Sequence, residues 1–270
     1  MNTLLEKEKK QFKGNELTGK VLGVVGLGAI GSLVARAALN LGMQVVGYDP
    51  ALSVAAAWRL PSQVQSMENL SSLFAKADYV SLHLPVFDST RGLINADVLN
   101  ASKPGLCLLN FARSEIVNVD DTIAALDAGK IRKFITDFPT PSLIGREDVI
   151  LMPHIGASTD EAEDNCAIMA AEQVKDFLEN GNITNSVNFP TVNLERSGEA
   201  RIAVANKNVP KILQSILAVL ADENINVADM INKSRDDVAY NLIDLAQRPS
   251  DSLLEKTRSL EGVMNVRLIA

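Results

Sequence analysis

The chain has 270 residues, of which 47% are hydrophobic and 22% are charged, and its formal net charge at pH 7 is -7. This composition is ordinary for a soluble globular protein, the length suits two domains, and a disordered chain is excluded. Scattered charges argue against a nucleic-acid-binding surface, and the most apolar stretch, 21–35, is too short to span a membrane.

The first residues show no apolar core followed by a cleavage site, so no secretory signal is expected and a cytoplasmic location is the default. The two cysteines, Cys107 and Cys166, stand alone. They lack the spacing of a metal site or a disulfide framework, so the sequence predicts neither. Cys107 lies in an apolar run and is expected to be a buried strand residue.

A glycine motif, V-V-G-L-G-A-I-G, carries Gly26, Gly28 and Gly31. Lys20–Gly26 is apolar and β-branched, which predicts a strand, and Ala29–Asn40 repeats apolar residues at helical spacing. In a strand-to-helix turn the first glycine permits the tight turn, the second lets a pyrophosphate approach, and the third lets helix and strand pack closely. The phosphate charge then rests on free N–H groups at the start of the helix.

Asp49 ends the second strand, 18 positions after the last glycine. Its carboxylate can accept hydrogen bonds from an adenosine ribose and would repel a 2'-phosphate, which predicts NAD rather than NADP as the cofactor. A charge-assisted hydrogen bond contributes about 1.5–3 kcal/mol, enough for a clear preference. Ala29 and Ile30, inside the motif, are assigned to the same site. The alternative is an ordinary glycine-rich turn.

Short apolar strands and helical segments then alternate along the chain. The helical segments include Ser66–Lys76 and Val119–Ala128, and the strands are Tyr79–His83, Gly105–Phe111, Lys133–Asp137 and Asp148–Met152. With the first two, six strands are expected. The rhythm predicts an α/β fold, a doubly wound parallel sheet of the Rossmann type with helices on both faces. Ligands are expected beyond the carboxyl ends of its strands.

Four strand ends read S-L-H-L-P, L-L-N-F-A-R-S, I-T-D-F-P and L-M-P-H-I-G-A-S-T. With the glycine motif, these segments resemble the D-isomer-specific 2-hydroxyacid dehydrogenases over about residues 12–190. The resemblance implies that Arg113 holds the substrate's carboxylate and carbonyl, for which a permanently charged, bidentate guanidinium is suited. It implies that His154 exchanges a proton with the substrate oxygen, since imidazole titrates near neutral pH.

The resemblance also implies a set of cofactor-lining residues. His83 lies in what looks like the family's cofactor-lining loop, and Asp137 resembles the acid that meets the nicotinamide side. The whole set at these strand ends is His83, Pro85, Phe111, Ala112, Arg113, Asp137, His154 and Gly156. Each has a structural alternative: an arginine in a surface ion pair, a structural histidine, or an aspartate that caps a helix.

The chain departs from the family pattern in two places. Family members have a glutamate that hydrogen-bonds the histidine, where this chain has Pro141 and Ser142; Glu147 is the nearest acid downstream. Three explanations of the missing glutamate are open: another carboxylate replaces it, His154 works unassisted, or the protein is a poor catalyst. The first part of the substrate lobe is also missing, while its return helix is expected at Asp160–Glu179. A truncated form or natural fragment of a longer enzyme is therefore expected.

The last third of the chain has a different rhythm, after a polar segment, 191–200, that reads as a linker. The order βαββαβ is that of a small regulatory module. Its expected elements are Arg201–Ala205, Pro210–Ala221, Ile225–Ser234, Val238–Ala246, Ser250–Leu260 and Val263–Ile269. The pattern resembles an ACT domain over about residues 200–270, so the predicted division is 1–190, 191–200 and 201–270.

In ACT domains that sense serine the first loop reads His-x-Asn-x-Pro-Gly, whereas this chain reads N-K-N-V-P-K from Asn206. Asn208 and the later Asn226 match, which implies a serine effector; the alternative is that both asparagines only shape turns. Unpaired sheet edges and the apolar helical stretch 168–178 predict at least a homodimer, with a homotetramer as the larger assembly.

Together the two resemblances imply NAD-dependent oxidation of the phosphorylated 2-hydroxy acid 3-phosphoglycerate to 3-phosphohydroxypyruvate, in serine synthesis. One alternative is an NAD-binding sensor or fragment without efficient catalysis. Another is a dehydrogenase of a different small 2-hydroxy acid, such as glyoxylate, hydroxypyruvate or lactate.

Overall fold

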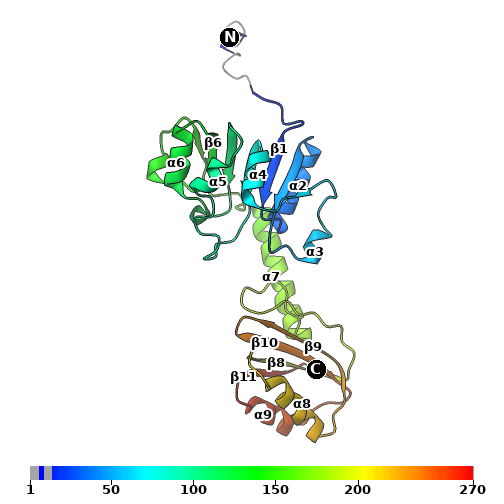
Figure 1. Ribbon diagram of the computed structural model, residues 1–270. Helices are drawn as coiled ribbons and strands as arrows, with labels where there is room; N and C mark the ends of the chain where they lie inside the picture. Colours follow the sequence, from blue (N-terminus) through cyan, green and yellow to red (C-terminus); the bar gives the residue numbers. More distant parts are fainter. Residues whose placement is uncertain (1–5, 9–13, 270) are drawn as a thin grey trace. The chain divides into compact units, whose positions relative to one another are not determined.

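A computed structural model describes residues 6–8 and 14–269 of the chain (Figure 1). The chain folds into two compact units that meet after Ile155 in the sequence, and each is described by itself. Within the described residues, no helix combines the length and the apolar character needed to cross a membrane.

The first unit is built on a seven-stranded parallel sheet in the order β3-β2-β1-β4-β5-β6-β7. The strands are β1 (Val21–Val25), β2 (Gln44–Tyr48), β3 (Gln65–Ser66), β4 (Tyr79–Leu82), β5 (Leu106–Asn110), β6 (Ile131–Thr136) and β7 (Val149–Leu151). The strand order reverses between β1 and β4. In open parallel sheets a ligand crevice lies outside the carboxyl ends of the strands at this point.

Helices cover both faces of this sheet, which confirms the doubly wound fold. They are α2 (Ala29–Asn40), α3 (Val54–Ala57), α4 (Leu70–Lys76), α5 (Ala96–Asn100), α6 (Val119–Asp127), and the 3-10 turns η2 (Ser114–Ile116) and η3 (Pro141–Leu143). Alternate residues of β1 show the two layers. Leu22 and Val24 pack in one core with Ala35 of α2. Gly23 faces α4, because a Cβ there would lie 2.4 Å from the Leu73 side chain.

The predicted helix Ser66–Lys76 is wrong in its first turn. Gln65 and Ser66 form β3 and pair with β2, so the sheet has seven strands instead of the six expected. The helix begins at Leu70 because Asn69 caps it, the Asn69 side chain accepting the Ser72 N–H at 2.8 Å. Residues before Asn69 fit the same helical spacing as those after it, so the sequence did not predict the short edge strand.

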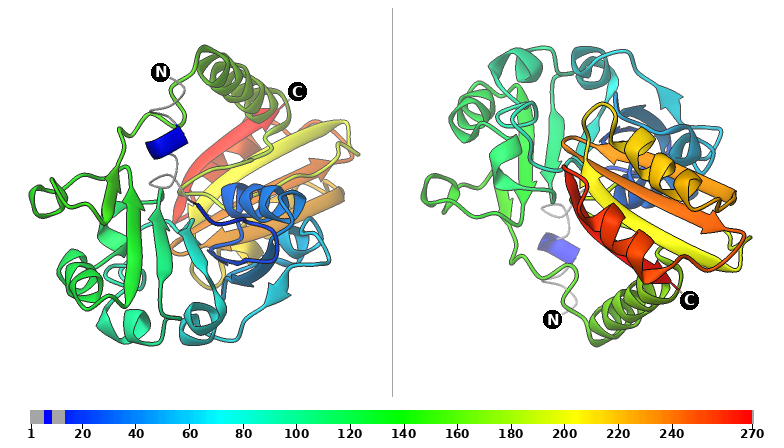
Figure 2. Two further views of the ribbon diagram at one scale, coloured as in Figure 1. Left: turned by 90° about the horizontal axis from the view of Figure 1, so that it is seen from above. Right: turned by 90° about the horizontal axis from the view of Figure 1, so that it is seen from below.

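The second unit contains α7 (Asp160–Asn180) and then the predicted βαββαβ order. Its later elements are β8 (Ala200–Lys207), α8 (Ile212–Asp222), β9 (Val227–Arg235), β10 (Val238–Leu245), α9 (Asp251–Arg258) and β11 (Val263–Ile269). The antiparallel sheet has the order β11-β8-β10-β9. Helices α8 and α9 lie over one face of it (Figure 2, right). There Ile202 and Val204 of β8 share a core with Ile216 and Leu253.

The other face of this sheet meets the end of α7 and the segment 182–194. Phe177, Ile183 and Val192 pack there with the Tyr240 ring. Within the segment 191–200, Val192 is fully buried and exchanges two backbone hydrogen bonds with Ile183. The fold thus gives this small sheet a second, thinner layer.

Candidate dinucleotide and substrate site

The glycine turn between β1 and α2 has the geometry that its sequence predicts. Gly26 has φ +90°, and a Cβ there would lie 2.4 Å from the carbonyl oxygen of His83. At Gly31 a Cβ would lie 1.9 Å from the carbonyl oxygen of Gly26. A Cβ on Gly28 would meet nothing within 4 Å, and Gly28 is the N-cap of α2 without a side-chain cap. The turn therefore leaves open space in front of a free helix N-terminus, which suits a phosphate group.

Asp49 lies directly after β2, beside this turn. Its half-buried carboxylate accepts the N–H of Leu27 at 2.9 Å and the N–H of Ala51 at 3.0 Å. The first bond ties the end of β2 to the glycine turn. The acid that the sequence assigns to the ribose is thus held in a fixed position.

A cavity of about 440 Å³ lies at the switch point of the sheet, and we call it the strand-end pocket. Six of the predicted site residues line it, namely Ile30, His83, Pro85, Phe111, Ala112 and Arg113. Leu84 and Val86 also line it and were not predicted. Their position in the segment after β4 was the only signal that could have indicated them. The pocket joins the start of α2 to the loops after β4 and β5.

The Arg113 loop is braced by Asn110, which is 1% exposed. The Asn110 side chain accepts the Ala112 N–H at 3.2 Å and donates to the carbonyl oxygen of Arg113 at 2.9 Å. Thr136 of the neighbouring strand donates its hydroxyl to the carbonyl oxygen of Asn110 at 3.0 Å. The Arg113 guanidinium is exposed and gives one hydrogen bond to its own loop, to the carbonyl oxygen of Ala112. A rigid loop thus presents a cation to the pocket.

His83 is half-buried in the wall of the strand-end pocket, and its Nε2 lies 2.9 Å from the Ser81 hydroxyl. Burial lowers the pKa of His83 below its ordinary value. Loss of water around the ring disfavours its charged form.

His154 lies on the loop after β7 and is exposed. Its ring meets the edge of the Phe138 ring, with centroids 4.8 Å apart and an interplanar angle of 69°. Such T-shaped aromatic pairs favour one ring orientation. Phe138 was not assigned to the site from the sequence, although it directly follows the strand-end Asp137.

Asp137 follows β6 and is 8% exposed, and its Oδ1 has no hydrogen-bond partner among the described residues. An unpaired buried carboxylate oxygen is costly, because it has lost water without gaining a donor. A ligand that brings an N–H donor would satisfy it, as the carboxamide of a nicotinamide does. The glycine turn, Asp49 and this oxygen together fit a bound dinucleotide.

The glutamate position of the family is occupied by η3, in the segment Pro141–Leu143. Within the described residues, no carboxylate is hydrogen-bonded to His154. Glu147 uses its backbone carbonyl to accept the Lys133 ammonium. No described group therefore replaces the missing acid.

Three other predicted positions, Gly156, Asn208 and Asn226, lie in the second unit. Gly156 is exposed there and does not line the strand-end pocket. Asn208 donates its side-chain amide to the carbonyl oxygen of Asp236 at 3.0 Å, and its N–H to that of Asp237 at 2.8 Å. These bonds hold two turns together, whereas Asn226 accepts the Ala246 N–H through its carbonyl oxygen.

The doubly wound sheet, the glycine turn and the acid after β2 define the class of dinucleotide-binding α/β proteins. Residues 2–156 match the family described as "D-isomer specific 2-hydroxyacid dehydrogenase, NAD binding domain". The chain therefore belongs to this family, and its first unit is an NAD-binding domain.

Relatives of known structure or function agree with this membership. The chain is 33% identical to a D-3-phosphoglycerate dehydrogenase of Haemophilus influenzae, over 97% of this chain and 65% of the relative. It is 30% identical to that of Escherichia coli K12, over 94% of this chain and 64% of the relative. Apo D-mandelate dehydrogenase of Rhodotorula graminis superposes with a TM-score of 0.58 at 29% identity, covering 67% of this chain and 54% of that one. The chain spans less than two thirds of the length of each.

Proposed function

We propose that the chain oxidises 3-phosphoglycerate to 3-phosphohydroxypyruvate with NAD, a reaction of serine synthesis. The main support is the strand-end pocket, where an exposed guanidinium lies on a braced loop beside the start of α2. The relatives named D-3-phosphoglycerate dehydrogenase align with nearly the whole chain, which supports this substrate over other 2-hydroxy acids.

The chain's own residues have distinct roles in this proposal. NAD, when bound, supplies the hydride acceptor. Arg113 grips the substrate carboxylate with two N–H donors and so orients the C2–H bond. His154 accepts the hydroxyl proton on a ring nitrogen, and Phe138 fixes the plane of that ring. The free oxygen of Asp137 accepts a hydrogen bond from the nicotinamide side.

The test is an assay of the intact chain with NAD and 3-phosphoglycerate at alkaline pH, with a carbonyl trap, followed by the absorbance of NADH. His154→Ala is expected to lower kcat by about 10²–10⁴-fold, the usual contribution of general base catalysis, while calorimetric NAD affinity stays within a few-fold. Equal losses of rate and NAD affinity would overturn the role of His154 as proton acceptor.

The substrate is tested by the same assay with D-lactate, and in the reductive direction with glyoxylate and hydroxypyruvate. Solved relatives named as glyoxylate reductase and D-lactate dehydrogenase share this fold at 26% identity. A higher kcat/KM for any of these acids than for the phosphorylated pair would replace the substrate and leave the reaction class intact.

A second candidate is an NAD-binding sensor without efficient catalysis. It is favoured by one observation: within the described residues, His154 lacks the carboxylate partner that the family pattern provides. Calorimetric NAD binding would select it if NADH were neither formed with 3-phosphoglycerate or D-lactate nor consumed with glyoxylate or hydroxypyruvate.

We also propose that the chain forms a homodimer or homotetramer, with pairing of second units building the larger assembly, and that it binds serine near Asn208 and Asn226. Its sheet ends in the edge strands β9 and β11, which are open to pairing. Sedimentation velocity tests the assembly, and a dimer or larger species is expected. Calorimetric titration with L-serine tests the effector, with Asn208→Ala and Asn226→Ala expected to weaken binding.

A further inference from the structure

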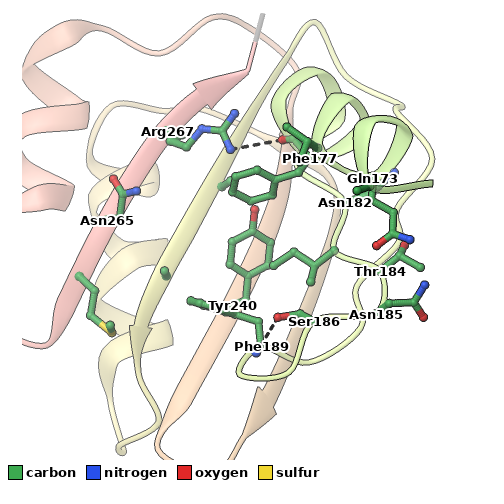
Figure 3. A pocket seen from close by; sticks show the side chains of 16 residues that line it. Gln173, Phe177, Asn182, Thr184, Asn185, Ser186, Phe189, Tyr240, Asn265 and Arg267 are labelled. Carbon is green, nitrogen blue, oxygen red and sulfur yellow. Dashed lines mark hydrogen bonds between the residues drawn. The ribbon is translucent and has the colours of Figure 1, made fainter. Parts of the chain in front are cut away.

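The second unit contains a cavity of about 640 Å³, which we call the sheet-face cavity. It lies between the end of α7, the segment 182–189 and the sheet face that α8 and α9 leave open (Figure 3). Its volume is in the range of small-molecule sites, about 300–1,000 Å³. The cavity lies wholly within the second unit and contains none of the residues assigned to NAD or to serine.

The space exists because of two small side chains on β8. Ala203 and Ala205 point to the cavity, whereas Ile202 and Val204 point into the core beneath the helices. On β10, Tyr240 lies directly opposite Ala205. A large residue at either alanine would occupy part of the cavity floor, so the alternation of small and large residues on β8 sets the depth of the cavity.

The walls of the sheet-face cavity are fixed, because side chains of the sheet hold the carbonyl groups at the end of α7. Tyr240 donates its hydroxyl to the carbonyl oxygen of Gly181 at 2.8 Å. Arg201, which is fully buried, donates to that of Asn180 at 2.8 Å. Arg267 donates to those of Phe177 and Leu178 at 3.2 and 3.0 Å. The cavity is thus preformed.

The charge of the lining has one sign. Among the described residues, Arg267 is the single charged residue that lines the sheet-face cavity, and none of the described carboxylates lines it. Its guanidinium lies 4.4 Å from the centre of the Phe177 ring and uses two of its five N–H donors on α7. Nearby, Gln173 and Asn265 make no side-chain hydrogen bond to any described residue. Three guanidinium donors and two side-chain amides thus have no hydrogen-bond partner among the described residues.

The floor of the cavity is apolar and aromatic. Figure 3 shows the hydroxyl end of Tyr240 directed toward the Phe177 ring, with Phe189 on the side of the covering segment. The Phe189 and Tyr240 rings meet edge to face, with centroids 5.9 Å apart. Such a floor favours a flat apolar group, since aromatic faces gain contact area at little cost in entropy.

We propose that the sheet-face cavity binds a small amphipathic anion. The ligand's acidic head pairs with Arg267, and its ring-sized apolar body lies against Phe177 and Tyr240.

The test is a fluorescence titration of the full chain, in excess NAD, with 8-anilinonaphthalene-1-sulfonate and with its uncharged analogue N-phenyl-1-naphthylamine. The sulfonate is expected to bind tighter than the neutral probe. Arg267→Gln should weaken the sulfonate about tenfold or more, because a charge-assisted hydrogen bond is lost, and should weaken the neutral probe much less, because that probe loses only the bracing of the wall.

Ala205→Leu should weaken binding of both probes, because the larger side chain occupies part of the floor against which their rings lie. The matched control is Ala218→Leu, the same change at an exposed position of α8, and it should alter neither affinity. Equal affinities for the two probes, or loss of binding in the control, would overturn the proposal.

Circular dichroism shows whether each variant folds. If one does not, a second measurement on the unaltered chain still tests the proposal. In the unaltered chain, the sulfonate should shift the NMR amide signals of 173–186 and of 203–205. Shifts confined to the first unit, or spread evenly over the chain, would overturn the proposal.

Discussion

The two sheets of this protein place their ligand sites differently. In the first unit seven parallel strands end at one edge, and the loops after β4 and β5 meet the glycine turn there. In the second unit four antiparallel strands run in alternating directions, and its cavity lies on a sheet face. A parallel sheet is covered on both faces, so only its edge is free. An antiparallel sheet can leave a face available, provided that small residues make room.

A buried ion pair in the second unit also contrasts with a surface pair in the first. In the second unit Arg201 and Asp244 form a bidentate pair with both side chains at most 1% exposed, and Ser197 adds two hydrogen bonds to Asp244. In the first unit Arg146 pairs with Asp127 and Asp148 at the surface. Breaking a buried pair leaves an uncompensated charge, whereas a surface pair can be replaced by water.

The largest predicted effect sharpens this contrast. Arg201→Met should destabilise the second unit by about 3–5 kcal/mol, because Asp244 is left buried without its partner. The matched change Arg146→Met in the first unit should have a much smaller effect, because water solvates the carboxylates that lose their partner. Hydrogen exchange resolved by residue, with urea unfolding, measures both. Similar costs for the two changes would contradict the contrast.

The same pair has a defined pH dependence. Burial alone raises the pKa of Asp244, but hydrogen bonds from Arg201 and Ser197 outweigh it and leave the pKa below its ordinary value. Since the folded pKa is lowered, the pair stabilises the unit above about pH 4, the unfolded value, and this contribution is lost as the pH falls through the folded pKa. The cost of Arg201→Met should therefore shrink in acid.

An intermediate effect is expected in the glycine turn, where one glycine is required for packing and another for the space in front of the helix. Gly31→Ala should cost about 1–3 kcal/mol of stability, since its Cβ would meet the carbonyl oxygen of Gly26. Gly28→Ala should cost less than about 1 kcal/mol, because its Cβ meets open space, yet it should still weaken NAD binding. Thermal unfolding and NAD calorimetry measure the two quantities. A Gly28→Ala chain with full NAD affinity would place the phosphates elsewhere.

The smallest effect concerns a wall of the sheet-face cavity. Burial raises the pKa of Tyr240 to about 12. Because the folded pKa is raised, the stabilisation that this group provides is complete below the unfolded value near 10 and is lost as the pH rises through 12. Ultraviolet titration should show one tyrosine component near pH 12 that disappears in Tyr240→Phe and persists in Tyr48→Phe. The Tyr240→Phe change itself should cost about 0.5–1.5 kcal/mol through the lost bond to Gly181.

Residue patterns along the chain predict the parallel sheet, the glycine turn with Asp49, and most of the strand-end pocket. These features depend on local spacing: a strand, a turn and a helix follow one another, and parallel strands bring their carboxyl ends to one edge wherever the loops lead. Arg113 and His83 line one pocket for this reason. The βαββαβ order of the second unit was also predicted from local residue spacing.

The features that join distant segments depend on tertiary contacts and were not predicted from the sequence. Arg201 and Asp244 are 43 positions apart and meet only because β8 and β10 pair in one register. The strand β3 exists because β2 offers it an edge, the His154 ring is oriented by Phe138, and the sheet-face cavity needs α7 to lie over Ala203 and Ala205. Such contacts depend on shape and register across the chain, which local residue patterns do not encode.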